Sequence, residues 1–170
     1  MPLATVHSIP CTSAAFAQLS AEILRAGKAL RFRARGASMQ PLLRDGDVLL
    51  VQPMGSRPVQ LGDVVLCSGE AGHVVVHRVV RRLAGPDSPL FTVQGDQLPR
   101  PDGALRGVQV YGRVVAIERS GAHIALDWPL MRMLSVLAVL RSRWNLGRLI
   151  WPPLVSRLVK RLPVLSRYLA

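Results

Sequence analysis

One short loop of this sequence, Gly36-Ala37-Ser38-Met39-Gln40-Pro41, has the composition of a loop that presents a nucleophile. Gly36 permits a tight turn and Pro41 fixes its own backbone φ angle, which together favour a short rigid loop with an exposed hydroxyl at Ser38. A serine hydroxyl is a weak nucleophile until a neighbouring base takes its proton. Chemistry at this loop therefore depends on a base supplied from elsewhere in the chain.

The positions of the lysines and histidines limit the choice of base. The only lysines are Lys28 and Lys160, and both lie outside residues 38–119, which we expect to form a β unit. A serine–lysine pair built within that unit is therefore excluded. His73 and His77 remain, and at a separation of four residues in a predicted strand their side chains would share a face. His77 lies in an apolar run, so a buried structural histidine is the alternative to a general base.

Two carboxylates further along the chain, Asp96 and Asp102, are candidate partners of Ser38 and His77. The alternative is that both aspartates form turns, since Pro99 and Pro101 lie beside them. The sequence leaves open which of the two contacts His77.

The first regular element expected is a helix over residues 13–26, capped by Thr12 or Ser13. Gly27 is a suitable end for this helix. Its apolar face would consist of Phe16, Leu19 and Ile23. Residues 30–35 then alternate between apolar side chains and arginines, which predicts a half-buried strand with an arginine face. That face is either solvated or a binding surface.

Short runs rich in valine and leucine dominate the middle of the chain, separated by clusters of glycine, proline, aspartate and serine. The strands expected there are 48–52, 63–67, 73–80, 90–94 and 108–117. Strands of this length and spacing predict a mainly β fold, a small irregular β-barrel or folded sheet. We therefore expect an N-terminal helix over residues 1–29, a β domain over 30–120 and a helical tail over 121–170.

The net charge of +12 is unevenly distributed. Residues 1–37 carry +4 and residues 38–119 carry +1, whereas residues 120–170 carry +7. Basic flanks predict an anionic partner, either a membrane surface or a nucleic acid. The two cysteines, Cys11 and Cys67, have no zinc-type spacing and form no disulfide framework. No cofactor is expected.

The basic tail has the pattern of an amphipathic helix. Over residues 154–169, apolar side chains alternate with arginines and a lysine, and tryptophans precede them. This pattern favours peripheral contact with a membrane surface, with packing onto the domain or onto a protein partner as the alternative. Nucleic acid is disfavoured because the basic residues lie on strongly apolar segments. There is no secretory signal and no apolar run of about 18 residues, so we expect a peripheral protein on the cytoplasmic side.

Five segments of the central region occur together in an order that resembles the signal peptidase and LexA-like serine peptidase superfamily. These segments are Gly36–Pro41, Asp45–Asp47, Leu61–Val65, Val76–Val80 and Phe91–Asp96, with Asp102 six residues later. The resemblance covers about residues 30–118. It is closest to the archaeal and endoplasmic-reticulum signal peptidases, in which histidine replaces lysine, and it implies a signal peptidase-like β fold.

The resemblance implies a role for each matching residue. Ser38 would be the nucleophile, His77 the general base and Asp102 the group that orients the imidazole, with Asp96 as a supporting carboxylate. The backbone N–H of Ser38 would stabilise the oxyanion. In the same loop, Met39 and Pro41 would line the substrate cleft, although Met39 could instead fill the core.

The expected function is a serine endopeptidase that cleaves a preprotein or precursor peptide. Signal peptidases normally carry a membrane anchor just before the serine segment, whereas residues 13–26 have the pattern of an amphipathic helix. This departure puts the processing of secretory preproteins in doubt. It also supports the alternative of a catalytically inactive β module that binds peptides or a membrane surface.

Overall fold

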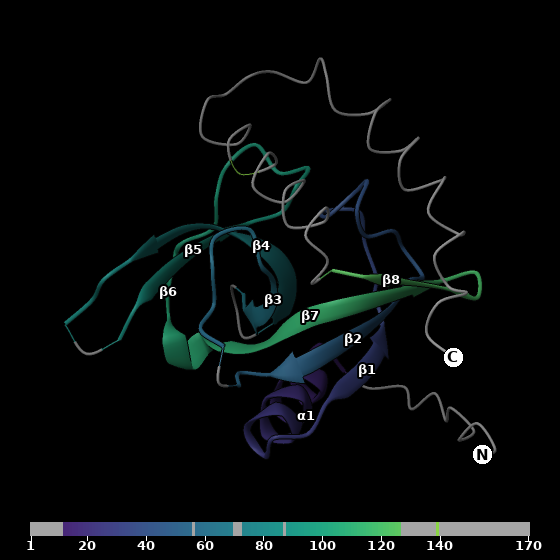
Figure 1. Ribbon diagram of the computed structural model, residues 1–170, viewed down its shortest axis with the longest axis horizontal. Helices are drawn as coiled ribbons and strands as arrows, with labels where there is room; N and C mark the ends of the chain where they lie inside the picture. Colours follow the sequence, from purple (N-terminus) through teal and green to yellow (C-terminus); the bar gives the residue numbers. More distant parts are fainter. Residues whose placement is uncertain (1–11, 56, 70–72, 87, 127–138, 140–170) are drawn as a thin grey trace.

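The computed structural model describes residues 12–55, 57–69, 73–86, 88–126 and 139. Within them, one helix packs against a strongly curved antiparallel sheet (Figure 1). The mainly β class predicted from the sequence is therefore confirmed. The basic tail beyond Leu126, apart from Val139, lies outside the described residues.

The helix, α1, spans Ser13–Arg25 and begins where the sequence predicts. The backbone N–H of Ala15 donates to Oγ1 of Thr12 at 3.3 Å, so Thr12 is the N-cap. Ser20, Ala21 and Leu24 form the buried face, whereas Leu19 is 48% exposed. The predicted position of Leu19 on the apolar face is therefore wrong. The buried residues Ser20 and Leu24 each follow a residue of the predicted apolar face by one position. The ring of Phe16 packs edge-on against Phe32 of the first strand.

The sheet contains every strand that the sequence predicts, with shifts at the ends, and two further short strands. In chain order the strands are β1 (Leu30–Arg33), β2 (Val48–Pro53), β3 (Val64–Ser68), β4 (Val74–Leu83), β5 (Leu90–Gln94), β6 (Ala104–Arg106), β7 (Val110–Arg119) and β8 (Ala122–Ala125). Their order in space is β1-β2-β7-β3-β4-β5-β6, and β8 pairs with β7. A 3₁₀ turn, η2 (Gly107–Gln109), precedes β7. The two strands missed are β6 and β8, which have only three and four residues.

Two apolar clusters fill the two faces of the curved sheet. Strand β3 separates them, because its side chains alternate between faces and four of its five residues are buried. Val64 and Leu66 belong to the first cluster, against which Leu30 and Phe32 of β1 also pack. Val65 and Cys67 belong to the second cluster, inside the lobe formed by β3 to β6. A strand buried on both faces explains why the run is continuously apolar.

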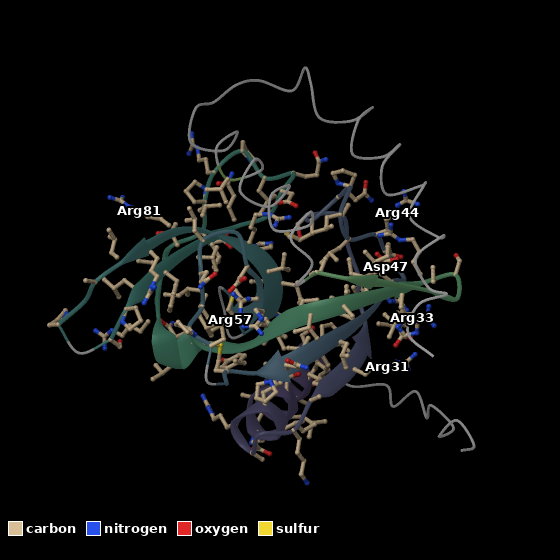
Figure 2. All side chains as sticks on the ribbon, viewed as in Figure 1. Arg31, Arg33, Arg44, Asp47, Arg57 and Arg81 are labelled. Atoms are coloured by element: carbon tan, nitrogen blue, oxygen red, sulfur yellow. The ribbon has the colours of Figure 1, made fainter. Side chains whose placement is uncertain are left out.

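The predicted arginine face is present on β1. Leu30 and Phe32 are half-buried and Arg31 and Arg33 are exposed. Arg31 forms an ion pair with Glu118 of β7, and this hydrogen bond holds the pKa of the Glu118 carboxyl below its usual value. Figure 2 shows Arg31 and Arg33 at the end of the molecule opposite Arg81 on β4. The exposed arginines of β1 therefore lie far from Arg81 of β4.

Among the described residues, no helix combines the length and the apolar character needed to cross a membrane.

Candidate active site

The structure brings together three side chains that lie far apart in the sequence. Ser38 lies in the loop between β1 and β2, His77 on β4, and Asp102 in the loop between β5 and β6. Oγ of Ser38 is 3.2 Å from Nε2 of His77, and Nδ1 of His77 is 2.5 Å from Oδ2 of Asp102. These two contacts have the geometry of a serine–histidine–aspartate triad.

The partner of each ring nitrogen favours one tautomer of the His77 imidazole. An ionised carboxylate only accepts hydrogen bonds, so Nδ1 of His77 carries the hydrogen that it donates to Asp102. In the neutral imidazole, Nε2 is then an acceptor and faces the hydroxyl of Ser38. The ring is therefore oriented so that Nε2 can accept a hydrogen bond from the hydroxyl of Ser38. His77 is 5% exposed, whereas the side chain of Asp102 is 34% exposed.

The second candidate carboxylate, Asp96, contacts Arg78 instead of His77. Its two oxygens accept from Nε and Nη2 of Arg78 at 2.8 and 2.7 Å. His77 and Arg78 are consecutive on β4, so their side chains lie on opposite faces of the sheet. Asp102 therefore contacts His77 on one face of the sheet, and Asp96 contacts Arg78 on the other. Asp96 supports the framework of the site through a buried ion pair, and it is not part of the serine–histidine chain.

Other sequence-based site residues occupy different places. Met39 is 4% exposed and belongs to the first apolar cluster, so its side chain packs in the core and does not line an open cleft. Pro41 is half-buried and follows a cis peptide bond. His73 is exposed and precedes β4, so of the two histidines only His77 reaches the serine loop.

The buried thiol of Cys67 interacts electrostatically with the carboxylate of Asp102. Burial raises the pKa of Cys67 to about 12, and the negative charge of Asp102 adds to this rise. The thiol is therefore protonated at neutral pH and is a poor nucleophile. Within the described part of the chain, no three His, Cys, Asp or Glu side chains are grouped to hold a metal ion.

Two ion pairs that the sequence did not indicate, Arg78–Asp96 and Arg119–Asp47, belong to hydrogen-bond networks that hold the loops near Ser38 and His77. Arg78 also donates to the carbonyl of Gly62 at 3.0 Å, which joins β4 to the turn before β3. Arg119 of β7 pairs with Asp47 and donates to the carbonyl of Leu42, which fixes the end of the serine loop. Figure 2 shows Asp47 beside Arg44, whose backbone N–H donates to Asp47 at 2.7 Å.

Gly95 is a further residue whose role only the structure reveals. A Cβ atom built at this position would lie 2.8 Å from the carbonyl oxygen of Ser38 and 3.0 Å from the side chain of Leu98. The absence of a side chain therefore lets the loop after β5 approach the serine loop closely.

We expect Gly95→Ala to displace the serine loop, to lower any activity at Ser38 and to cost about 1–3 kcal/mol of stability, the usual penalty for overpacking. Gly107→Ala is the matched control, since nothing lies within 4 Å of a Cβ at Gly107. Urea unfolding and an activity assay on both variants test this prediction. Equal behaviour of the two variants would contradict it.

Comparison with known protein families gives a match over the region that contains the site. A family model described as Peptidase S24-like matches residues 6–115, which is more than half of the chain. The matched residues include the triad and the strands that position it, and they support the superfamily that the sequence segments resemble. No curated protein matches the chain.

Proposed function

Because the chain belongs to the Peptidase S24-like family, we propose that it is a serine endopeptidase in which Ser38 is the nucleophile and His77 is the general base. One observation carries the proposal: Ser38, His77 and Asp102 form a continuous hydrogen-bonded chain, with distances of 3.2 and 2.5 Å. Each contact lies within the reach expected of a catalytic base and of the group that orients it.

In the proposed mechanism, Oγ of Ser38 attacks the carbonyl carbon of the scissile peptide while Nε2 of His77 takes the hydroxyl proton. The Asp102 carboxylate stabilises the resulting imidazolium. The backbone N–H of Ser38 donates to the oxyanion of the tetrahedral intermediate. His77 then gives its proton to the leaving amine, which leaves an acyl-enzyme. A water molecule, deprotonated by His77, hydrolyses the ester and regenerates Ser38.

A histidine-type mechanism fits this chain better than a serine–lysine mechanism. Lys28, the lysine among the described residues, follows α1 and is exposed, whereas Nε2 of His77 lies 3.2 Å from Oγ of Ser38. By resemblance to the histidine-type signal peptidases, the substrate would be a preprotein or precursor peptide. It would bind in an extended conformation, with small residues before the scissile bond.

The experiment that tests the function compares the wild-type chain with Ser38→Ala. A peptide library is incubated with each protein and new termini are identified by mass spectrometry, while a fluorophosphonate reports on the reactivity of Ser38. Cleavage and labelling by the wild type, both lost in Ser38→Ala, are the expected results. A folded wild type that neither cleaves nor is labelled would favour the inactive β module, and cleavage that persists in Ser38→Ala would assign it to another residue.

A second part of the proposal is peripheral membrane contact through the basic tail, which is suggested by its sequence pattern. The full chain should co-sediment with anionic vesicles, whereas a chain truncated after Leu126 should stay in the supernatant. This truncation keeps all of β8, which ends at Ala125, and also keeps the hydrogen bond from the backbone N–H of Leu126 to the carbonyl of Val115 at 2.8 Å. Neutral vesicles serve as the control. Equal sedimentation of both chains with anionic vesicles would argue against a role for the tail.

A further inference from the structure

The loop after β5 is hydrogen-bonded to the serine loop at two backbone carbonyls, those of Ser38 and Gln40. The backbone N–H of Gln97 donates to the carbonyl of Ser38 at 2.8 Å. The side-chain Nε2 of the same glutamine donates to the carbonyl of Gln40 at 3.1 Å. One residue therefore holds the main chain at Ser38 and again two residues later.

The two hydrogen bonds of Gln97 link the serine loop to the loop that carries Asp102. Gln97 and Asp102 belong to the same β5–β6 loop, and the backbone N–H of Asp102 donates to the carbonyl of Val93 at 2.8 Å. The β5–β6 loop therefore contacts both the serine loop, through Gln97, and the imidazole of His77, through Asp102. Small errors in the relative position of reacting groups have large effects on rate, so a contact of this kind matters to chemistry.

We propose that Gln97 is a positioning residue for the nucleophile, acting through its side-chain hydrogen bond to the Gln40 carbonyl. This inference rests on the proposed peptidase function. The Gln97 side chain is exposed, so when its amide is removed water can replace it at the Gln40 carbonyl and stability changes little. The serine loop nevertheless gains freedom, and Ser38 Oγ spends less time within reach of His77.

The test replaces Gln97 with methionine, which has a similar length and shape but no donor. Loss of one neutral hydrogen bond corresponds to a decrease of about 3- to 10-fold in kcat for peptide cleavage and in the rate of fluorophosphonate labelling. KM and the melting temperature should stay close to wild type. Labelling forms the bond from Ser38 Oγ to phosphorus with release of fluoride, and His77 takes the hydroxyl proton, so its rate reports on the Ser38–His77 pair.

Two further variants separate positioning from general structure. Gln97→Lys restores a donor on a side chain long enough to reach the Gln40 carbonyl and should recover most of the lost rate. Gln18→Met removes an exposed glutamine of α1 that bonds to Glu22 and should leave the rate unchanged. A wild-type rate in Gln97→Met, or a Gln97→Lys variant no faster than Gln97→Met, would overturn the inference.

The design distinguishes this inference from the proposed function. If the wild type is not labelled and does not cleave, the peptidase proposal itself fails. If the wild type reacts and Ser38→Ala does not, while Gln97→Met reacts at the wild-type rate, only the role of Gln97 is rejected.

Discussion

Replacing Ser38 or His77 with alanine is expected to lower kcat/KM for peptide cleavage by about 10⁴-fold or more, with the fold retained. Without Oγ there is no nucleophile, and without Nε2 the hydroxyl keeps its proton, so either loss stops acyl-enzyme formation. Because the two groups act as a unit, the double variant should be about as slow as either single variant. Rates come from fragment release measured by mass spectrometry, and circular dichroism reports the fold.

The matched control for His77 is the neighbouring histidine, His73. It is exposed and lies before β4, four residues from His77, so His73→Ala removes an imidazole without touching the triad. We expect wild-type kinetics from this variant. A His77→Ala enzyme that cleaved as fast as His73→Ala would leave the proposed mechanism without its base.

The second large effect separates the two aspartates. Asp102→Asn should lower kcat by about 10⁴-fold, because an amide donor facing Nδ1 favours the wrong tautomer of His77. Stability should change little, since the Asp102 side chain is one-third exposed. Asp96→Asn should instead destabilise the fold by about 3–5 kcal/mol, the usual cost of breaking a buried ion pair, because it removes the carboxylate that pairs with Arg78. The side chains of Arg78 and Asp96 are 3% and 7% exposed.

Both variants are measured by urea unfolding and by kinetics under conditions where each remains folded. The prediction is a crossed pattern, in which one substitution removes activity and the other removes stability. A large loss of stability in Asp102→Asn together with a stable but inactive Asp96→Asn would reverse the roles assigned to the two carboxylates.

The sequence by itself was sufficient for the features that depend on local pattern. Alternation of Leu30 and Phe32 with arginines predicts β1, because side chains of a strand alternate between a buried and a solvated face. Thr12 or Ser13 predicts the start of α1, because a hydroxyl can satisfy a free backbone N–H there, and Thr12 is the residue that does so. The positions of Lys28 and Lys160 left histidine as the base available to Ser38 within the β unit. The short strands β6 and β8 escaped prediction because each contains a single large apolar side chain, Leu105 or Ile124, whereas β1 shows two at alternate positions.

The tertiary structure decided what depends on contacts between distant segments. Asp96 and Asp102 are equivalent in sequence terms, and only the opposite directions of Arg78 and His77 on β4 assign each carboxylate its partner. The side chain of Met39 could face a cleft or the core, and packing against the first apolar cluster places it in the core. Gln97 gave no sequence signal, because its contacts with the serine loop form only when the β5–β6 loop closes over residues about 57 positions earlier. Local propensity has no information about such closures, since their energy comes from hydrogen bonds and packing between elements that meet only in the folded chain.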